Sequence, residues 1–489
     1  MTVTSVTGAS SACYQWSAIQ WRIIEKQVHR LQMRIAKAVR EGRYGKAKAL
    51  QQLLTHSYAA KVLATKRVTS NSGGKTAGVD GVVWKTKSEK MRGAIGLKAR
   101  GYSPQPLRRI NIPKKSDPTK TRPLGIPTIR DRAMQALYLL ALEPIAETQA
   151  DQHSYGFRQK RSCADAIEQC FIVLSRQASA QWILEGDIKA CFDTISHPWL
   201  ENNIPMNRKI LTRWLNAGYI EKDMFYSTTK GTPQGGIISP TLANMTLDGM
   251  ENLVKGLTKQ ADKVNFVRYA DDFIITGSTR EVLQEKVKPA LEAFLKERGL
   301  ELSQEKTRIT KIDDGFDFLG FNVRKYNGKL LIKPAKKSVL SFIREIRKLI
   351  KENQTVKTEE LIRQLNARLL GWSLYYRHAV SKQIFSYVDC SIFKAIVRWI
   401  KRRHPHKSTK WWRKNYFRQQ DFRNWIFYAK IKSSEGVKET LDLFYASYVK
   451  VKRHIGVSAS KLPFWRHFTV RATSPHFLKM AMFEFIFFL

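Results

Sequence analysis

Arg268-Tyr-Ala-Asp-Asp-Phe273 is the stretch of sequence on which the interpretation of the whole chain depends. Its two adjacent carboxylates, Asp271 and Asp272, lie between two short apolar runs, 266–267 and 273–275. This pattern predicts a β-hairpin with the acid pair at its tight turn. An acidic tip on a buried hairpin is costly in a strongly basic chain unless the tip holds a cation. Two-metal phosphoryl-transfer sites need such carboxylates, with metals roughly 3.5–4 Å apart; the alternative is a turn with two solvated acids.

The composition indicates a polyanionic partner. The chain has 489 residues, with 85 Lys and Arg against 41 Asp and Glu, and therefore a formal net charge of +44. Such a charge favours nucleic acid or an acidic membrane surface as the partner. The membrane is the weaker alternative, because no apolar run approaches the roughly 20 residues that span a bilayer. The length predicts about two to four domains, and a hydrophobic content of 43% is ample for their cores.

No targeting signal and no cysteine-based metal site is visible in the sequence. The first seven residues lack a basic segment followed by an apolar one, so they do not form a secretory signal. The five cysteines form no Cys-x-x-Cys pair and no Cys/His cluster, which argues against structural zinc and disulfides. We therefore expect a cytoplasmic protein, in the bacterial cytosol or nucleoid, without membrane association. The oligomeric state stays open.

Helical and mixed segments follow one another along the chain. Residues 15–67 carry apolar residues at helical spacing, whereas 104–325 alternate short apolar strands with helices in an α+β manner. Between them, Ser70 to Gly81 superficially resembles a phosphate-binding P-loop. It lacks the required glycine and the preceding apolar strand, so we interpret it as an ordinary loop. From about 335 onward the pattern is helical and more basic, and residues 361–376 predict an amphipathic helix.

The C-terminal part combines basic and aromatic residues. Residues 398–432 contain twelve Lys or Arg and nine aromatic residues with a single acid, Asp421. Such a mixture suits phosphate contact and base stacking, which predicts nucleic-acid binding. The alternative is a helical domain whose aromatic residues form its core while its cations face water. The last stretch, 472–489, is too short to span a membrane and too apolar for a free tail. It either docks on the core or reflects a truncated or shifted reading frame.

A third carboxylate stands about 80 residues before the acid pair. Residues 182–186 predict an apolar strand that ends at Asp187. A strand-end Asp beside an Asp pair is the arrangement that binds two Mg²⁺ ions in nucleotidyl transfer, because Mg²⁺ prefers hard oxygen ligands. One ion would activate a primer 3′-hydroxyl and the other would hold the triphosphate, with Mn²⁺ able to substitute. Taken alone, Asp187 is equally well interpreted as a helix N-cap.

A glycine-rich loop, Lys230-Gly-Thr-Pro-Gln-Gly-Gly236, lies between these acids. Its glycines allow the backbone to approach a ligand closely, and Gln234 is suited to hydrogen-bond a sugar or a base edge. The alternative is a plain turn that leads into a helix over 239–252.

Seven blocks in this order resemble the reverse transcriptases, and most closely the group II intron-encoded maturase reverse transcriptases. The blocks are Arg122-Pro-Leu-Gly-Ile-Pro127, Tyr155-Gly-Phe-Arg158, Asp187-Ile-Lys-Ala-Cys-Phe-Asp193, Thr232-Pro-Gln-Gly-Gly-Ile-Ile-Ser-Pro240, Tyr269-Ala-Asp-Asp272, Leu302-Ser-Gln-Glu-Lys-Thr307 and Phe318-Leu-Gly-Phe321. They cover about 100–325, and seven ordered blocks are far more specific than any one of them. The segment 335–400 resembles the thumb or maturase domain of that family, and the stretch after 400 its DNA-binding region.

The resemblance implies an α+β fold: a right-hand polymerase with fingers and palm, followed by a helical thumb/maturase domain and a basic helical C-terminal region. The implied domains are an N-terminal extension that binds template or intron RNA (1–81), fingers and palm (82–330), the thumb/maturase domain (331–400), a basic DNA-binding region (401–471) and the apolar tail (472–489).

The resemblance also implies roles for single residues. Asp187, Asp271 and Asp272 would be the catalytic acids that hold the metals, and Phe192 would be a steric gate whose ring blocks a ribose 2′-hydroxyl. The incoming dNTP would be bound by residues from five places in the chain: Lys114, Arg122, Phe192, Gln234 and Lys306. The primer end would be gripped by Phe318, Leu319 and Gly320. Further contacts to nucleic acid would come from Arg158, Trp372, Tyr375, Tyr376, Lys401, Arg402, Arg403, Lys410, Arg413 and Lys414.

The implied function is RNA-directed DNA polymerisation, with binding of group II intron RNA, help in splicing, and intron mobility by target-primed reverse transcription. The implied partners are intron RNA, an RNA template, a DNA primer or target, and dNTPs. Two departures from the family limit this transfer. No cysteine follows Cys390, so we expect no HNH-type endonuclease, and Leu370-Gly-Trp372 replaces the Arg-Gly-Trp that is frequent in the maturase segment, which puts one RNA contact and splicing in question.

Two other functions stay open at this point. One is a splicing-only, RNA-binding maturase whose polymerase site has decayed, against which the intact acids argue. The other is a domesticated reverse transcriptase in defence or DNA repair, which would share every catalytic block. The thumb-like and basic regions favour the intron type.

Overall fold

The computed structural model describes residues 15–114, 117–420, 423–432, 438–456 and 464. The described chain forms two compact units, with 15–162, 184–309 and 464 in unit 1 and 163–183 and 310–456 in unit 2. The boundary expected between the palm and the thumb/maturase domain lies at 330/331 instead, and all the expected domain boundaries stay predictions. The predicted tail at 472–489 lies outside the described residues. None of the helices in the described ranges combines the length and apolarity needed to cross a membrane.

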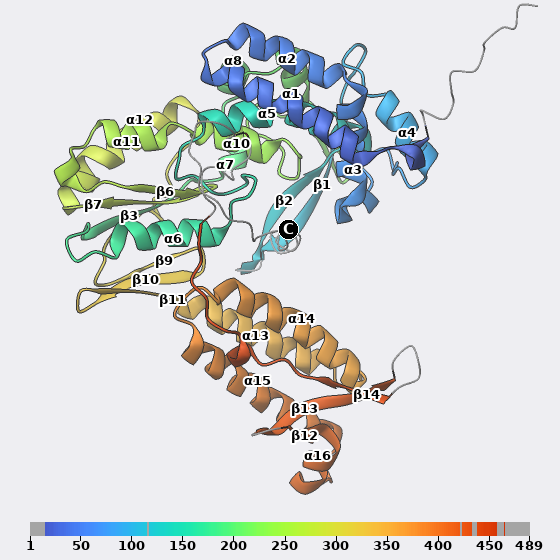
Figure 1. Ribbon diagram of the computed structural model, residues 1–489, viewed down its shortest axis with the longest axis vertical. Helices are drawn as coiled ribbons and strands as arrows, with labels where there is room; N and C mark the ends of the chain where they lie inside the picture. The colour runs from blue at the N-terminus through green and yellow to red at the C-terminus, as the bar shows by residue number, and fades with distance from the viewer. Residues whose placement is uncertain (1–14, 115–116, 421–422, 433–437, 457–463, 465–489) are drawn as a thin grey trace, which may run out of the picture. The chain divides into compact units, whose positions relative to one another are not determined.

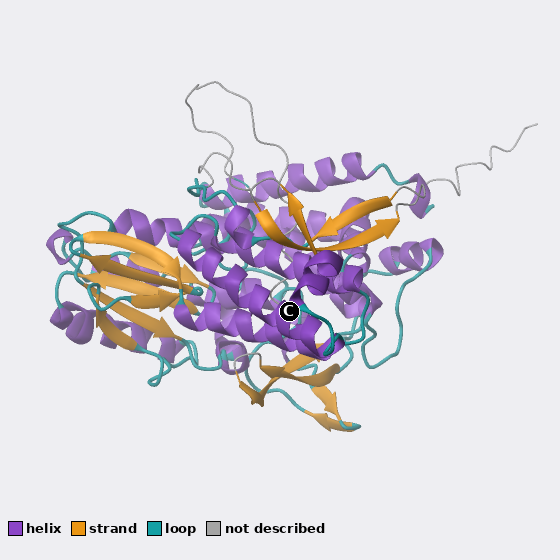
Figure 2. Ribbon diagram, turned by 90° about the horizontal axis from the view of Figure 1, so that it is seen from below, coloured by secondary structure: helices purple, strands orange, loops and turns teal. Residues whose placement is uncertain are grey.

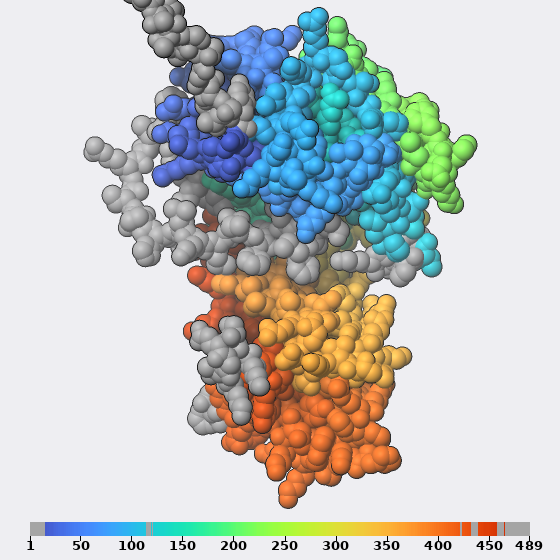
Figure 3. All heavy atoms as spheres, turned by 90° about the vertical axis from the view of Figure 1, so that its right-hand side faces the viewer, coloured from blue at the N-terminus to red at the C-terminus, as the bar shows by residue number. Residues whose placement is uncertain are grey.

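Unit 1 begins with helices that pack around α5 (Ile129–Gln149), which is buried along most of its length. Apolar residues at helical spacing, such as Ile24, Val28 and Ile35, form the buried face of the first long helix. The elements before α5 are η2 (Trp16–Ala18), α1 (Trp21–Arg40), α2 (Tyr44–His56), α3 (Tyr58–Ser70), η3 (Ser72–Lys75) and α4 (Lys87–Ile95). These helices are blue in Figures 1 and 3 and form a continuous surface on the face shown in Figure 3. The helical prediction for 15–67 is therefore confirmed.

A four-stranded sheet of unit 1 has the order β2-β1-β4-β5. Its strands are β1 (Leu107–Lys114), β2 (Asp117–Ile126), β4 (Tyr219–Glu221) and β5 (Met224–Tyr226). β1 and β2 are antiparallel, with Ile112 opposite Arg122, and β1 runs parallel to β4. This sheet carries two of the residues predicted to bind the triphosphate.

A second four-stranded sheet, of order β6-β7-β3-β8, carries the predicted acids. Its strands are β3 (Trp182–Asp187), β6 (Phe266–Tyr269), β7 (Asp272–Gly277) and β8 (Arg308–Lys311). The apolar residues of β7 are buried because the sheet is covered by helices. The helices of this region are α7 (Cys191–Thr194), α8 (His197–Asn203), α9 (Arg208–Leu215), α10 (Ser239–Leu247), α11 (Met250–Gly256), η4 (Gln260–Asp262), the π-helix η5 (Val282–Val287) and α12 (Lys288–Glu297).

The helix predicted over 239–252 is divided in two. α10 ends at Leu247 and α11 begins at Met250. Gly249 has a φ of +101°, a conformation that an α-helix does not contain. The break frees the side chain of Asp248 to pair with a buried arginine, described below.

Unit 2 contains a three-stranded sheet, a three-helix bundle and a second three-stranded sheet (Figure 2). The first sheet has the order β11-β10-β9, and its strands are β9 (Phe316–Phe318), β10 (Phe321–Tyr326) and β11 (Lys329–Pro334). The helices of the unit are α6 (Cys163–Leu174), α13 (Lys336–Glu352), α14 (Thr358–Tyr376) and α15 (Lys382–Arg403). α14 confirms the amphipathic helix predicted over 361–376, and its buried Leu365 lies in one core with Ile346 and Ile396.

The prediction that the C-terminal region is helical is wrong for 417–442. Three strands lie in this range: β12 (Phe417–Gln420), β13 (Arg423–Lys432) and β14 (Lys438–Asp442), in the order β12-β13-β14. They are preceded by α16 (Thr409–Tyr416) and followed by η6 (Ala446–Tyr448). Phe417 pairs with Phe427, and both side chains are buried in the core that α15 shares. Aromatic and β-branched residues favour strands that are buried on one face. A helical prediction based on the basic character of this region does not take the strand preference of its aromatic residues into account.

Candidate active site

The acid pair lies at the tip of the hairpin formed by β6 and β7, which confirms the predicted turn. Tyr269 pairs with Asp272, so Ala270 and Asp271 alone form the connection. Ala270 has a φ of +58°. A positive φ at the first central residue suits a two-residue hairpin turn but is unfavourable for a residue with a Cβ atom. Neighbouring groups must therefore stabilise this turn.

Asp187 ends β3, which is the neighbour of β7 in the sheet. Gly186 allows the close approach, because a Cβ atom there would lie 2.2 Å from Cζ of Phe273. The side chain of Asp272 comes within hydrogen-bonding reach of Asp187. Nζ of Lys306 donates to Oδ2 of Asp187 at 2.9 Å. The structure thus brings the three predicted acids and one predicted cation together.

The electrostatics of the three acids fit a hard divalent cation. Burial raises the pKa of Asp272, and the charges of Asp271 and Asp187 raise it further. Burial also raises the pKa of Asp271, with Asp187 adding to the rise and Lys306 opposing it. No three Asp, Glu, His or Cys side chains, among those described, already form a closed metal-ligand group. The oxygens are nevertheless the donors that Mg²⁺ prefers, and a cation would relieve their repulsion.

The segment 301–306 holds Lys306 near the acids. The backbone N–H of Ser303 donates to the carbonyl oxygen of Asp187 at 2.8 Å, and that of Lys189 donates to the carbonyl oxygen of Glu301 at 2.9 Å. The hydrogen bond to Asp187 raises the pKa of Lys306. The ammonium group is largely exposed and has further donors for a second anion.

Phe192 and Gln234 lie on two segments that pack against each other. The N–H of Thr232 donates to the carbonyl oxygen of Phe192 at 2.6 Å. Gly231, at a φ of +83°, has no room for a Cβ atom, which would lie 2.6 Å from the carbonyl carbon of Asp193. Nε2 of Gln234 donates to both carboxylate oxygens of Asp193, at 3.0 and 2.9 Å. Asp193 is absent from the predicted site and orients Gln234.

Phe157 is a second residue of this region that the sequence analysis does not single out. Its ring lies edge-to-face with that of Phe192, with centroids 6.2 Å apart and planes at 80°. Phe157 is 54% exposed and has a φ of +58°. An exposed aromatic residue in a left-handed conformation, directly beside the predicted gate, is a candidate wall of the nucleotide site. The only signal in the sequence is its place in the block Tyr155 to Arg158.

The two fingers residues lie on β1 and β2. Arg122 is exposed, and its charge acts against the rise in the pKa of Asp271, so the two groups are close enough to interact. Lys114 ends β1, and its side chain is not among those described.

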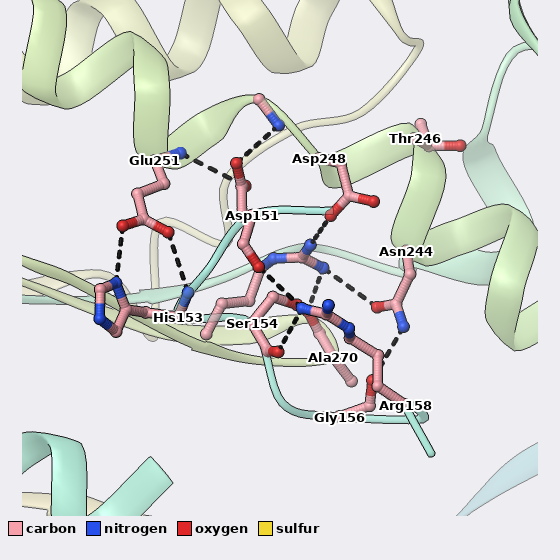
Figure 4. Close-up of polar contacts among 12 residues, drawn as sticks. Asp151, His153, Ser154, Gly156, Arg158, Asn244, Thr246, Asp248, Glu251 and Ala270 are labelled. Atoms are coloured by element: carbon pink, nitrogen blue, oxygen red, sulfur yellow. Dashed lines mark hydrogen bonds and ion pairs between the residues drawn. The ribbon is translucent and has the colours of Figure 1, made fainter. Parts of the chain in front are cut away.

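Arg158 is turned into the protein, where a contact with nucleic acid is not supported. Its Nε donates to Oε2 of Glu147 at 2.9 Å. Its Nη1 donates to the carbonyl oxygen of Ser154 at 2.8 Å (Figure 4). Only 7% of its side chain is exposed. The loop that contains Ser154 curls around this guanidinium, whose donors satisfy the loop carbonyls. The role of Arg158 in the structure is to hold that loop.

The predicted primer grip forms the tip of the β9–β10 hairpin. Phe318 is buried and pairs with the first residue of β10, so Leu319 and Gly320 alone form the connection, at φ values of +50° and +78°. Oη of Tyr375 donates to the carbonyl oxygen of Leu319 at 2.9 Å, and Oη of Tyr376 donates to that of Gly320 at 3.2 Å. Two tyrosines predicted to contact nucleic acid therefore also hold this tip, and their contact with nucleic acid stays a prediction.

Most aromatic residues of unit 2 belong to its core, whereas the cations predicted to contact nucleic acid face water. Trp372 stacks on Phe342 with centroids 4.7 Å apart and an interplanar angle of 5°. Trp412 and Phe427 are buried in the bundle core. This arrangement favours the alternative in which the rings are structural. The predicted basic contacts are all exposed: Lys401, Arg402, Arg403, Lys410, Arg413 and Lys414.

Three parts of the chain match known protein families. Residues 112–323 match the family described as reverse transcriptase (RNA-dependent DNA polymerase), and residues 16–97 match the N-terminal domain of reverse transcriptase. Residues 339–417 match the maturase-specific domain of group II introns. The first two matches assign a fold of the palm-and-fingers type to the region that contains the acids.

Individual proteins agree with these matches. The chain is 33% identical over 330 residues to the group II intron-encoded protein LtrA of Lactococcus lactis subsp. cremoris, with 54% of each chain covered. It is 34% identical over 304 residues to protein YkfC of Escherichia coli K12, with 53% of this chain and 78% of YkfC covered. The match thus spans about half the length of LtrA. A solved telomerase from Candida albicans is similar at 15% identity and a TM-score of 0.36 over 61% of this chain and 60% of that one, too low to carry an argument.

Proposed function

The chain belongs to the group II intron-encoded reverse transcriptase and maturase family, and on that premise we propose that it is an RNA-directed DNA polymerase. It makes cDNA by two-metal nucleotidyl transfer. One observation carries the proposal. Asp187, Asp271 and Asp272, from the ends of two strands and a tight turn, lie close together, and Lys306 donates a hydrogen bond to Asp187. Three mutually repelling, partly buried acids are unfavourable for stability and are expected where they serve chemistry.

Asp187, Asp271 and Asp272 would hold two Mg²⁺ ions, with Mn²⁺ able to substitute. When bound, such ions lower the pKa of a primer hydroxyl and neutralise charge on the departing pyrophosphate. The protein places the oxygen ligands at the end of one strand and the tip of one turn. Partial burial of Asp187 and Asp271 strengthens their attraction for a cation, since water screens a half-buried charge less than an exposed one.

The cations of this region would bind the triphosphate. Lys306 has free donors beside Asp187, and Arg122 projects from β2 close enough to act on Asp271. Lys114 is proposed for the same role from the end of β1. Positive charge fixed near the transferring phosphoryl group stabilises the charge that develops there.

Phe192 would select the sugar, because a ring beside the ribose leaves no room for a 2′-hydroxyl. Gln234 would line the same pocket, and its amide is oriented by Asp193. The tip at Leu319 and Gly320 would touch the primer end through its backbone, since Phe318 is buried.

Binding of RNA and DNA would involve the exposed cations of unit 2 and the N-terminal helices. The exposed arginines and lysines of 401–414 present positive charge from the end of α15, from α16 and from the loop between them. The proposed partners are group II intron RNA, an RNA template, a DNA primer or target site, and dNTPs. With these the protein would assist splicing and support intron mobility by target-primed reverse transcription.

A reducing cytoplasmic compartment is the proposed location. The four cysteines among the described residues form no disulfide with one another, and three of them are buried. Free buried thiols persist where the surroundings are reducing.

Extension of a DNA primer on an RNA template, with and without Mg²⁺, tests the proposal. We expect extension by the wild type and none by Asp271→Ala, while both proteins bind intron RNA equally. Asp313→Ala is the matched control, since that carboxylate is half exposed and pairs only with Lys311 at 3.3 Å among the described residues. A well-folded wild type that binds RNA tightly but extends no primer would overturn the proposal in favour of a splicing-only maturase.

A further inference from the structure

Arg268, two residues before the acid turn, is completely buried. Its Nη2 donates to Oδ1 of Asp248 at 2.6 Å, and its Nη1 donates to Oδ1 of Asn244 at 3.1 Å and to the carbonyl oxygen of Ala270 at 3.4 Å (Figure 4). A buried guanidinium is costly unless its charge is paired and its donors are satisfied. Here Asp248 pairs with the charge, and Nη1 also donates to the strained residue of the acid turn, while Nε has no hydrogen-bond partner among the described residues.

Asn244 connects this guanidinium to a second segment. Its Oδ1 accepts from Arg268, and its Nδ2 donates to the carbonyl oxygen of Gly156 at 2.8 Å. Because the two ends of the amide have different partners, only one orientation of the side chain satisfies both. Asn244 is itself buried in α10, whose backbone holds it in place.

The segment joined in this way lies directly against the acid hairpin. The N–H of Arg268 donates to the carbonyl oxygen of His153, and its own carbonyl oxygen accepts from the N–H of Tyr155, both at 2.9 Å. A Cβ atom on Gly156 would lie 2.3 Å from the backbone nitrogen of Ala270, so nothing separates the two backbones. The next residue along the loop is Phe157, whose ring meets the predicted gate.

We propose that Arg268 and Asn244 are positioning residues that hold the acid turn and the Phe157–Phe192 ring pair as one body. Metal binding and sugar selection are then set by the same buried contacts. This inference rests on the proposed function and extends it to residues that touch neither metal nor nucleotide. Both ends of the network terminate at the site, one at the carbonyl oxygen of Ala270 and the other at the carbonyl oxygen next to Phe157.

Asn244→Ala is the first test, because it leaves the Arg268–Asp248 ion pair intact. It removes the donor to Gly156, so Phe157 loses its fixed place beside Phe192. Misplacement of groups at a reacting centre by about 1 Å costs up to ~100-fold in rate. We expect the preference for dNTP over rNTP, measured as the ratio of the two kcat/KM values, to fall on the order of tenfold.

Thr246→Val is the matched control for that substitution. Thr246 lies on the same helix, is completely buried, and donates only to the carbonyl oxygen of Leu242 one turn earlier, at 2.9 Å. The change costs a hydrogen bond without touching either end of the network. We expect its selectivity to equal that of the wild type. Equal losses of selectivity in Thr246→Val and Asn244→Ala would overturn the inference, because general loosening of α10 would explain both.

A double-mutant cycle asks whether Asn244 acts through Phe157. Phe157→Leu removes the ring contact directly, so adding Asn244→Ala should change selectivity little further. We expect the two effects to be strongly non-additive. Fully additive effects, or unchanged selectivity in Asn244→Ala, would overturn the inference.

Arg268→Lys tests the other end without relying on polymerisation. A lysine keeps the charge beside Asp248 but cannot reach the carbonyl oxygen of Ala270 and Asn244 at once. Titration of the nucleic-acid-free protein with Mn²⁺, followed by electron paramagnetic resonance, should show binding weakened by about tenfold, with Thr246→Val unchanged. Unaltered Mn²⁺ binding by a folded Arg268→Lys would overturn the inference. Failure of the wild type to extend a primer, with these Mn²⁺ differences present, would instead count against the proposed function alone.

Discussion

Two of the hairpins that end in two-residue turns, β6–β7 and β9–β10, present different groups at their tips. The β6–β7 turn contains Ala270 at a φ of +58°, and the β9–β10 turn contains Leu319 at +50°. Both residues have a Cβ atom in a left-handed conformation, which costs about 1–2 kcal/mol. In each case a side chain donates a hydrogen bond to the carbonyl oxygen of the strained residue: Arg268 of the same hairpin in one, and Tyr375 of α14 in the other.

The difference lies in what each tip presents. The first tip carries acids that repel one another and is supported by a buried ion pair in unit 1. The second carries no charge and is supported by two phenol hydroxyl groups in unit 2. Strained turns persist only where several contacts with the surrounding structure hold them in place, and they concentrate at functional sites. At the first tip, the repulsion between the acids therefore lowers stability. At the second tip, only the backbone conformation does so.

Removal of charge at the first tip should have the largest effect. Asp272→Asn should lower primer extension by about a thousandfold or more, because a metal-holding oxygen is lost. The same change should raise the midpoint of thermal unfolding when no divalent ion is present, since desolvation and the charges of Asp271 and Asp187 disfavour the charged acid. Calorimetry in a chelator beside a primer-extension assay checks both parts. A lower midpoint would mean that Asp272 stabilises the fold and that the contrast between the tips is wrong.

Shape at the second tip is tested by Gly320→Ala against Gly328→Ala. Both glycines have a φ of +78°. A Cβ atom at Gly320 would lie 2.9 Å from Oη of Tyr376, whereas at Gly328 it would meet only Nε2 of Gln177 at 3.9 Å. Gly328→Ala should cost about 1 kcal/mol through its backbone conformation alone, and Gly320→Ala about 2–3 kcal/mol. Denaturant unfolding measures the difference, and equal costs would show that Tyr376 does not confine the tip.

The second hairpin should also lose stability in mild acid. The ring of His378 packs 5.1 Å from that of Phe321, the first residue after the tip. Burial lowers the pKa of His378 to about 4, and the neighbouring His454 and Arg377 add to this. Because the unfolded chain takes up a proton near pH 6.5 and the folded chain does not, stability is full above pH 6.5 and declines as the pH falls toward 4. We expect a loss of about 1–2 kcal/mol for unit 2 over this window.

His378→Phe keeps a ring on Phe321 and removes the titrating group. Denaturation at pH 7 and at pH 5 should then give more similar free energies of unfolding than in the wild type. An unchanged pH dependence would assign the effect to another group.

The hydroxyl groups at the second tip should have the smallest effect. Tyr375→Phe and Tyr376→Phe each remove one donor and leave the ring packing intact, which costs about 0.5–1.5 kcal/mol. If the tip touches the primer end, each change should raise KM for the primer by about two- to fivefold and leave kcat nearly unchanged. Steady-state kinetics at varied primer concentration separates the two constants. A fall in kcat with constant KM would assign the tyrosines to a later step.

Several elements follow from local sequence because their signals are local. The acid hairpin is marked by apolar runs on both sides of a polar turn, and α14 by apolar residues at helical spacing. Asp187 is marked by its place at the end of an apolar strand. In each case the residues that form the pattern are near neighbours in the chain, so no knowledge of distant contacts is required.

Other features could not be inferred in this way. The basic stretch after 400 looks helical by composition, yet Phe417 and Phe427 pair as strands on the core of the bundle. Arg158 looks like a phosphate ligand, yet Glu147 and the loop carbonyls use its donors. The residue type of a basic or aromatic side chain is the same whether it binds nucleic acid or packs in the core. Only the neighbouring residues in the folded structure determine which of these it does.

By itself, the sequence determined the family, the three acids and the strands that carry them, because these depend on short patterns in fixed order. The tertiary structure alone decided which residues support the acids. Asn244 joins Arg268, 24 positions away, to Gly156, 88 positions away. Such contacts form only when the chain has folded, since a buried N–H group donates to whichever carbonyl oxygen the packing brings to it.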